Sequence, residues 1–463
     1  MTTKFPEFVK IIINTFEQAG FQIYIVGGAV RDILTNRDVN DWDFTTNATP
    51  DQILKLFPDG FYDNVFGTIG IAHESCLKPY EITTFRREIG FTDKRHPDKV
   101  EWGESLEEDL SRRDFTINAM ALRRATLAQG KLSNLPFELI DPHGGQNDLK
   151  NKLIKAVGDP VERFREDALR VIRGVRIASE LGFTIEEKTF EAIKMQGESV
   201  NLVSKERIRD ELLKLLASLY PYEGVVMLRN SGLLTQILPE VEKSFGVKQK
   251  SPKRHHLYDV GTHLFMSLKN CPSKDPLVRL ATLLHDIGKP QTQQVTEKGI
   301  ITFYNHEVIG SRMAKEIADR LRLSKKQKDK LWTLIRYHQF TVDERQTDGA
   351  LRRFIRKVGK DNLQDMLDLR TGDRLGGGAS ETSWRLEKFK KRLEEVQKQP
   401  FSVKDLEVDG NDVMKTLNIP SGPKIGQILS KLFAEVEEDL SKNNRDYLLK
   451  RIKEIGNNEN TKV

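Results

Sequence analysis

Gly27-Gly28-Ala29-Val30-Arg31-Asp32 and Asp41-Trp42-Asp43-Phe44-Thr45-Thr46 are the two segments that decide how the first part of the chain folds. The apolar run at 22–26, ahead of the glycines, predicts a buried strand, and residues 30–34 predict the first turn of a helix. Gly27 and Gly28 then close a strand-to-helix turn, where backbone amides meet phosphate oxygens without a Cβ in the way.

The second segment alternates with a period of two. Asp41 and Asp43 are therefore expected on one face of a strand, with Trp42 and Phe44 on the other. Two carboxylates so placed repel each other unless a divalent cation lies between them, and this is the ligand arrangement of two-metal phosphoryl transfer. Each segment alone is a weak signal, because a Gly-Gly turn is commonly only a turn and an Asp-x-Asp pair a solvated strand edge.

Taken together, the two segments resemble the head of the nucleotidyltransferase superfamily, in the branch that holds bacterial tRNA CCA-adding enzymes and poly(A) polymerases. The resemblance implies that Asp41 and Asp43 are catalytic and hold Mg²⁺. It also implies that Gly28 and Arg31 steady the triphosphate of the incoming nucleotide.

Composition sets the broad class of the protein. With 463 residues the chain is expected to form three or four compact units. Hydrophobic residues at 38% and charged residues at 31% are typical of a globular protein, and no stretch predicts a signal peptide or a membrane span. Cys76 and Cys271 are the two cysteines, which favours a reducing cytoplasm, and a net charge of +6 permits a polyanionic partner without requiring one.

The rest of the first 110 residues predicts helices at 7–19 and after Thr49, and strands at 68–72 and 80–85. Glu81 is either a third catalytic acid or an ordinary edge-strand residue. The polar segment 90–103 predicts a surface loop; it contains Arg95-His96-Pro97-Asp98-Lys99-Val100, which resembles the family's flexible segment linked to addition of the terminal A. The run 64–70 resembles the CCA-adding enzymes rather than the polymerases.

A second motif follows at Ser111-Arg112-Arg113-Asp114-Phe115-Thr116-Ile117-Asn118. Its arginines are either a helix cap with solvated charge or a phosphate clamp, because a guanidinium presents a planar fork to phosphate oxygens. The resemblance favours Arg113 as a triphosphate ligand. The turn 141–145 resembles the short motif that joins the head to the next domain.

The segment 166–176 spaces Arg170, Arg173 and Arg176 by three residues, which predicts a helical ridge with Asp167 one turn before it. Such a ridge is commonly an exposed face with i,i+3 ion pairs. The run also resembles the family's fourth motif, which implies that Asp167 and Arg170 read the Watson–Crick edge of C or A, with Arg173 and Arg176 beside them on the nucleotide side.

Histidines gather in the second half of the chain. His285-Asp286, in an apolar run closed by Gly288, resembles the HD phosphohydrolase superfamily, and the order of the other positions matches. The resemblance implies a divalent-metal site at His263, His285, Asp286 and Asp373, with His306 and His338 left for a second ion or a substrate phosphate. Phosphohydrolase activity and a purely structural metal both remain open for this site.

The fold class expected is α+β: a small mixed α/β head of the polymerase-beta-like type, followed by helical neck, HD-bearing body and tail. The domain borders expected are 1–150, 151–245, 246–380 and 381–463, with an exposed linker at 248–254 and helices at 321–332, 383–399 and 427–454. The function expected is addition of CCA to the 3′ end of tRNA from CTP and ATP. Addition of A alone, poly(A) synthesis, and an HD phosphohydrolase with an RNA-gripping head are the alternatives, and no obligatory protein partner is indicated.

Overall fold

The structure is a computed structural model, and it describes residues 5–62, 67–74, 78–89, 99–102, 105–125, 137–249, 258–340, 342, 345–380, 384–397 and 403–460. The chain forms two compact units, Met1–Glu242 with Arg320–Leu323, and Lys243–Asp319 with Ser324–Val463. None of the helices in these described ranges has the length and apolar character needed to cross a membrane. The four domain borders expected from the sequence stay a prediction.

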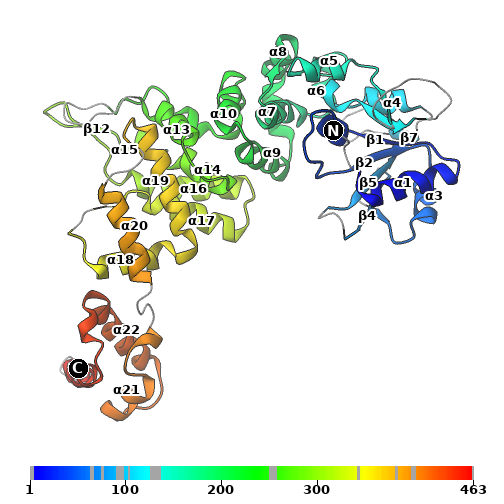
Figure 1. The fold of residues 1–463 in the computed structure, drawn as a ribbon. Coiled ribbons are helices and arrows are strands. Elements are labelled where there is room, and N and C mark those ends of the chain that lie inside the picture. Colours follow the sequence, from blue (N-terminus) through cyan, green and yellow to red (C-terminus); the bar gives the residue numbers. More distant parts are fainter. Residues whose placement is uncertain are drawn as a thin grey trace. The chain divides into compact units, whose positions relative to one another are not determined.

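A seven-stranded sheet organises the start of the first unit, in the order β3-β4-β5-β2-β1-β8-β9 (Figure 1). β2 and β5 are parallel, and the other neighbouring pairs are antiparallel, so the sheet is mixed. Its strands are β1 (Ile23–Val26), β2 (Asp43–Thr46), β3 (Phe61–Tyr62), β4 (Thr68–Ile71), β5 (Tyr80–Thr84), β8 (Ala121–Arg124) and β9 (Phe137–Ile140).

The two faces of this sheet have different roles. One face packs on α1 (Glu7–Gln18) and α3 (Pro50–Leu56), where aromatic rings meet. The ring centroids of Phe8 and Tyr80 lie 5.1 Å apart, and those of Phe16 and Phe57 lie 6.0 Å apart. On the other face, Tyr24, Val26 and Ala121 form a small core with Leu106 and Leu110 of α4 (Leu106–Ser111). Because Val26 pairs with Asp43, the Asp43 side chain belongs to this second face.

Further helices belong to the first unit. One of them, α2 (Gly28–Leu34), lies between β1 and β2 in the chain. The others follow the sheet: α5 (Gly145–Lys150), α6 (Pro160–Glu166), α7 (Arg170–Leu181), α8 (Glu187–Gln196), α9 (Lys205–Ala217), α10 (Pro221–Asn230), α11 (Leu233–Ile237) and α12 (Pro239–Glu242). Two short pairs accompany them: β10 (Leu153–Ile154) with β11 (Thr184–Ile185), and β6 (Arg86–Ile89) with β7 (Lys99–Trp102).

The second unit is helical apart from the short pair β12 (Gln294–Val295) and β13 (Ile301–Thr302). Its first helices are α13 (Val260–Lys269), α14 (Pro276–Leu284), α15 (Lys289–Thr292), α16 (His306–Arg320, whose last residue belongs to the first unit), α17 (Lys325–Tyr337), α18 (Asp348–Val358), α19 (Leu363–Gly376) and α20 (Trp384–Gln397). Glycines let α13 and α19 approach closely, since a Cβ on Gly376 would lie 2.4 Å from Ser267 Oγ.

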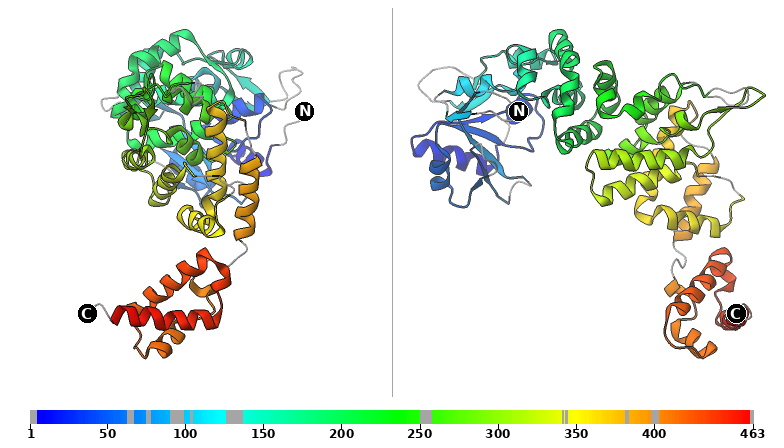
Figure 2. Two further views of the ribbon diagram at one scale, coloured as in Figure 1. Left: turned by 90° about the vertical axis from the view of Figure 1, so that its left-hand side faces the viewer. Right: turned by 180° about the vertical axis from the view of Figure 1, so that it is seen from behind.

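The last helices, α21 (Gly410–Leu417), α22 (Pro423–Glu438) and α23 (Arg445–Asn460), have a hydrophobic core of their own. Val413, Ile428, Leu432, Leu448 and Ile452 form its centre. In both views of Figure 2 these orange and red helices lie side by side.

Two expectations about local structure need correction. The predicted helix 427–454 is two helices, because Asp439 accepts hydrogen bonds from Ser441 and Asn444 accepts one from the Asp446 amide, which interrupts helical pairing between them. Within the predicted loop 90–103, residues 99–102 form β7, whereas Arg95–Asp98 lies outside the described residues. The run 64–66, Cys76 and the linker residues 250–254 also lie outside the described residues.

Candidate active site

The strand-to-helix turn brings Gly27 next to the catalytic carboxylate expected at Asp43. Gly27 has φ +72° and precedes α2, as predicted. A Cβ at this position would lie 3.1 Å from Asp43 Oδ2 and 3.2 Å from Arg113 Nη1, so the turn, the acid and the arginine converge on one point. A side chain larger than that of glycine would meet both functional groups there.

Asp41 does not lie in the strand, contrary to the sequence prediction, because β2 begins at Asp43. β1 ends at Val26, the register partner of Asp43, and the chain turns away at Gly27, so no β1 residue is left to pair with Asp41. Asp41 is half-exposed and its Oδ2 lies 2.5 Å from Lys78 Nζ. Trp42 is buried on the opposite side, as expected.

Glu81 lies on the strand next to Asp43. The two residues are register partners in the parallel pair β2 and β5, so their side chains leave the sheet on the same face. The position suits the third carboxylate that the sequence left open, although its role stays a prediction.

Arg113 is held at the site by a buried carboxylate behind it. Asp109 on α4 accepts from Arg112 Nη2 at 2.7 Å and from Arg113 Nη2 at 3.2 Å. Burial by itself raises the pKa of Asp109, but the two guanidinium groups outweigh burial and hold that pKa below its ordinary value. Asp43 shows the opposite result: burial raises its pKa, the nearby Asp41 charge adds to the rise, and Arg113 opposes it without cancelling it.

A chain of polar contacts connects Arg31 to α7. Arg31 Nη1 donates to Asn118 Oδ1 at 3.0 Å, and Asn118 Nδ2 donates to Asp114 Oδ1 at 3.3 Å. Asp114 Oδ2 lies 2.8 Å from Arg173 Nη2. Burial works against the Asp114 charge, but Arg173 and Arg170 lower the pKa of this carboxyl. The second and fourth motifs are therefore in direct contact.

Asp167 interrupts the helix that the sequence predicts through 166–176. α6 ends at Glu166, α7 begins at Arg170, and Asp167 between them is extended. The cause is its side chain, because Asp167 Oδ1 accepts from the Leu169 amide at 3.0 Å, a local bond that competes with helical pairing. Arg207 on α9 donates to both carboxylate oxygens of Asp167, at 2.8 Å and 3.3 Å.

The three arginines of the predicted ridge have different partners. Arg170 Nη1 donates to Glu166 Oε2 at 2.5 Å, and its Nη2 donates to the Arg112 carbonyl at 3.0 Å. Arg173 pairs with Asp114, and Arg176 donates to Glu211 and Glu180, each at 2.6 Å. With a side chain only 13% exposed, Arg176 joins α7 to α9 by buried ion pairs. Its placement at a nucleotide stays a prediction.

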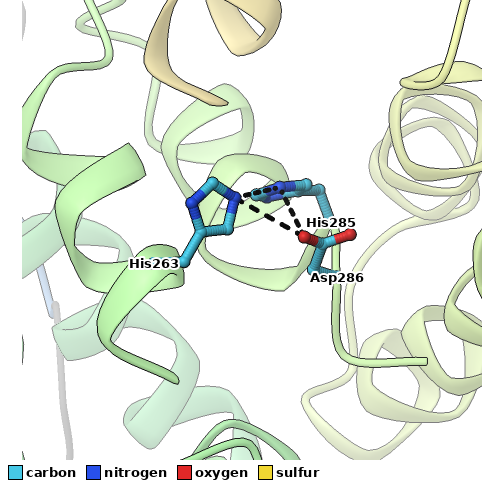
Figure 3. Close-up of side chains that lie close together, drawn as sticks. All are labelled: His263, His285 and Asp286. Carbon is cyan, nitrogen blue, oxygen red and sulfur yellow. Dashed lines mark hydrogen bonds and ion pairs between the residues drawn. The ribbon is translucent and has the colours of Figure 1, made fainter. Parts of the chain in front are cut away.

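The histidines predicted in the second unit do converge. His263 on α13 and His285, directly after α14, have their Nε2 atoms 3.2 Å apart, and Asp286 Oδ2 lies 3.5 Å and 3.3 Å from them (Figure 3). Asp373 on α19 adds Oδ1 at 3.2 Å from His263 Nε2. These four residues form the first set that the sequence assigned to a metal.

Asp286 also faces a second set. Its Oδ1 lies 3.2 Å from His306 Nε2 and 3.6 Å from His338 Nε2. The ligand-capable atoms form two groups, His263-His285-Asp286 and Asp286-His306-His338, each with its atoms within 4.8 Å of one another. Asp286 belongs to both groups, with one oxygen toward each.

The ring orientations fit metal ligation. The Nδ1 atoms of His285, His306 and His338 lie 2.7–2.8 Å from backbone carbonyls, which directs each Nε2 into the cluster. His306 Nε2 is buried and makes no hydrogen bond. Burial lowers the pKa of His338, whereas for His285 the Asp286 and Asp373 charges overcome burial and raise the pKa to about 10. Nitrogen and oxygen donors in this number suit a divalent transition metal.

Four contributing residues were not found from the sequence: Lys78, Asn118, Arg207 and Lys289. Lys289 Nζ lies 2.6 Å from Asp286 Oδ2 and donates to Gln249 Oε1 at 2.8 Å. Asn118 is the last residue quoted for the second motif, and Lys289 directly follows Gly288 of the His-Asp run. Their places in the sequence could therefore have marked them as site residues. Arg207 follows Asp167 by 40 residues, and no local pattern links the two.

Comparison with known proteins gives the family. The model of the poly A polymerase head domain matches residues 23–155, the probable RNA and SrmB-binding site of polymerase A matches 182–245, and the HD domain matches 255–369. A CCA-adding enzyme of Staphylococcus haemolyticus is 30% identical over 460 residues, which cover 98% of this chain and 99% of that protein. The chain belongs to the CCA-adding enzyme family.

Two other CCA-adding enzymes match this chain, one over about half of its length and one over almost all of it. An enzyme of Lactobacillus helveticus is 45% identical over 216 residues, so the match spans about half the length of that relative (51%) and 46% of this chain. The crystal structure of the Bacillus stearothermophilus CCA-adding enzyme in complex with CTP superposes with a TM-score of 0.70 at 26% identity, covering 99% of this chain and 100% of that one. The nucleotidyltransferase head and the HD domain imply use of divalent metal.

The opposite pKa shifts of Asp43 and Asp109 give a stability prediction. The pKa of Asp109 in the folded chain lies below the ordinary value of 3.8, so its charge stabilises the fold above pH 3.8, and this stability is lost as the pH falls through the folded-state pKa. The pKa of Asp43 in the folded chain lies above 3.8, so its charge destabilises the fold as the pH rises past 3.8. At neutral pH without metal, Asp109→Asn should therefore cost about 3 to 5 kcal/mol, because it leaves arginines unpaired. Asp43→Asn should cost nothing or stabilise.

Urea unfolding of the two full-length variants, followed by circular dichroism in EDTA, measures this difference. Asp38→Asn, at an exposed carboxylate, serves as the control. A large loss of stability in Asp43→Asn would show that Arg113 compensates this carboxylate in full, contrary to the pKa argument.

Proposed function

We propose that the protein adds CCA to the 3′ end of tRNA, using CTP and ATP as substrates. The observation that carries the proposal is the convergence of Gly27, Asp43 and Arg113 in the head of a chain that aligns over almost its full length with a CCA-adding enzyme. The B. stearothermophilus structure of the same fold is a complex with CTP, which supports a pyrimidine nucleotide as one substrate.

In the proposed reaction the 3′-hydroxyl oxygen of the RNA attacks the α-phosphorus of the nucleoside triphosphate, and pyrophosphate leaves. Asp41 and Asp43 are the oxygen donors that suit Mg²⁺, which, when bound, supplies charge neutralisation and alignment of the reacting oxygens. For Asp41 to take part, its carboxylate must exchange Lys78 for the metal, and the exposed ion pair between them is weak enough for this.

Arginines and the glycine turn are proposed to hold the triphosphate. Arg113 has its Nη2 on Asp109, and its Nη1 lies close to the Gly27 turn. Arg31 is fixed by Asn118, and Gly28 keeps the turn open in front of it. A guanidinium fixed from behind loses little side-chain entropy when phosphate binds, so these contacts favour an oriented triphosphate.

The base is proposed to be read by Asp167 and Arg170. Asp167 offers an acceptor to the exocyclic amino group of C or A, and Arg170 offers donors to the ring nitrogen or carbonyl. Arg207 fixes the carboxylate plane of Asp167 by two hydrogen bonds. Arg173, on the same helix as Arg170, forms an ion pair with Asp114, and Arg176 connects α7 to α9 through its ion pair with Glu211.

The first test is incorporation of labelled CTP and ATP, with Mg²⁺, into tRNA lacking CCA, tRNA ending in CC, and an unstructured RNA. CCA addition predicts two C and one A on the first RNA and nothing on the third. Asp43→Asn should lower the rate by more than about a hundredfold, since metal contributions amount to several kcal/mol. Asp38→Asn should transfer normally.

Other outcomes of this assay select the alternatives. Extension of the CC-ending tRNA alone identifies an A-adding enzyme, and a long A tract on the unstructured RNA identifies a poly(A) polymerase. Unchanged transfer by Asp43→Asn would remove the assignment of the metal site.

Arg207 gives a separate prediction about nucleotide choice. Arg207→Gln removes the fork that orients Asp167, so the ratio of CTP to UTP incorporation should fall about tenfold, the effect of roughly 1.4 kcal/mol in discrimination. Binding of tRNA should not change. Lys205→Gln, at the start of the same helix α9, is the matched control. An unchanged ratio in Arg207→Gln would show that Asp167 is oriented without Arg207.

The HD cluster favours a second activity, which we propose as metal-dependent phosphoester hydrolysis. The supporting observation is the pair of ligand groups that share Asp286, with three imidazoles oriented by backbone carbonyls. His263, His285, Asp286 and Asp373 would hold a divalent ion, which when bound would make water acidic enough for attack on a phosphoester near neutral pH. Lys289 neutralises part of the charge of Asp286.

Metal analysis tests this second proposal. The purified chain should contain a divalent transition metal, and His285→Ala or Asp286→Ala should remove it together with hydrolysis of bis(p-nitrophenyl) phosphate, while nucleotide transfer continues. His143→Ala, in the head, is the control. Bound metal without any hydrolysis, combined with a lower unfolding temperature of the two variants, would assign a structural ion instead.

A further inference from the structure

A pocket of about 300 Å³ lies in the second unit between the end of α17 and one face of α18. Ala350, Arg353, Phe354 and Lys357 line it from α18 at spacings of three and four residues, so they share one face of that helix. We call it the α17–α18 pocket. Its volume lies in the range of small-ligand sites.

The pocket adjoins the HD cluster through its wall. Glu307, which lines the pocket, directly follows the ligand-capable His306, and its Oε2 lies 4.0 Å from His306 Nδ1. Arg336, also in the lining, precedes His338 by two residues and approaches Glu307 Oε1 at 3.5 Å. His306 and His338 belong to the group that faces Asp286 Oδ1. A molecule in the pocket would thus lie next to this group.

The charge of the lining suits an anion. Arg336, Arg353 and Lys357 face a single carboxylate, Glu307. The pair of Arg353 with Glu438, at 3.1 Å, is exposed and therefore readily exchanged. Lys357 is exposed and has no hydrogen bond or ion pair within the described residues. Two guanidinium groups and an ammonium group are the donors that bind phosphate.

The remaining lining suits a planar ring with polar edges. Tyr337, Phe340 and Phe354 supply aromatic surface, and the rings of Phe340 and Phe354 are 5.0 Å apart. Gln346 Oε1 is buried without a hydrogen-bond partner in the described structure. An unsatisfied buried acceptor is costly, so this oxygen favours a ligand that brings an N–H or O–H donor.

We propose that the α17–α18 pocket binds a nucleotide, either free or at the 3′ end of an RNA, with its phosphate on Arg336, Arg353 and Lys357 and its base against the aromatic wall. The proposal names the substrate class of the HD cluster, and in that respect it rests on the phosphohydrolase activity proposed above. Binding itself needs no metal, so the two proposals are separable.

The experiment measures binding of AMP to the full chain in EDTA by calorimetry, and locates the site with 8-azido-AMP by photolabelling and peptide mapping. The label should appear on peptides of α17 and α18. Lys357→Glu should weaken this binding about tenfold, the loss of one charge-assisted contact. Lys326→Glu, the same charge change at an exposed position near the start of α17, is the matched control and should bind normally.

Gln346→Leu separates a ligand role from a structural one. If Gln346 Oε1 serves only the fold, its replacement by an apolar group is neutral or stabilising and leaves AMP binding unchanged. The proposal predicts weaker binding with unchanged or higher stability. Label confined to the head, or equal AMP affinity in Lys357→Glu and Lys326→Glu, would exclude a free nucleotide as the occupant of the α17–α18 pocket. The proposal is then overturned if the RNA probe described next also fails to label α17 and α18.

A short single-stranded RNA whose 3′-terminal residue is 8-azidoadenosine distinguishes the two sources of nucleotide. Labelling of α17 and α18 by this RNA and not by AMP assigns the RNA end as the occupant; labelling by AMP alone assigns a free nucleotide. Labelling by neither overturns the proposal. Normal AMP binding by the unmutated, metal-loaded chain without any hydrolysis of bis(p-nitrophenyl) phosphate would leave the pocket standing while removing the phosphohydrolase.

Discussion

The head depends on whether arginines offset the free-energy cost of removing each of its carboxylates from water. Asp109 and Asp114 are buried with arginines against them, and each stays charged because the guanidinium groups outweigh the cost of burial. These two acids fix Arg113 and Arg173 in place. Asp43 is only partly buried, yet desolvation still raises its pKa, because Arg113 is already engaged by Asp109 and opposes the rise without cancelling it. The site therefore keeps one carboxylate whose charge a cation can satisfy.

The HD cluster is arranged on the same physical basis with a different donor set. Asp286 is held charged by Lys289 and by the imidazoles of His285 and His306, and the partly exposed Asp373 by those of His263 and His285. The imidazoles of His285, His306 and His338 owe their direction to a backbone carbonyl three residues earlier in the chain, as between His285 and Thr282. Close helix packing keeps these helices in register, since a Cβ on Gly288 would lie 2.2 Å from the His306 carbonyl oxygen. The small residue in the His-Asp-x-Gly run thus positions a ligand 18 residues away in the chain.

Local pattern predicted the parts of the fold that local forces determine. The strand at 23–26, the glycine turn and the capped helix after Thr49 all follow from periodicity and turn chemistry. The parallel pairing that places Glu81 beside Asp43 joins segments distant in the chain, and the sequence left it open. The pattern failed where a side chain competes with the backbone. Asp41 follows period two but has no strand left to pair with, and Asp167 follows helical spacing but bonds the Leu169 amide instead. Arg207 was out of reach because its partner is 40 residues distant, and only the packing of α7 on α9 brings them together.

The break at Asp167 separates the acid from an arginine series that stays on one helix. Arg170, Arg173 and Arg176 all lie on α7 at spacings of three residues, so they form the predicted ridge. Along this ridge the first arginine contacts Glu166 and the Arg112 carbonyl, the second contacts Asp114, and the third lies between Glu180 and Glu211. Asp167 is extended and precedes α7, and Arg207 on α9 donates to both of its carboxylate oxygens. The orientation of this acid therefore depends on Arg207 and on its own bond to the Leu169 amide, and not on helical geometry.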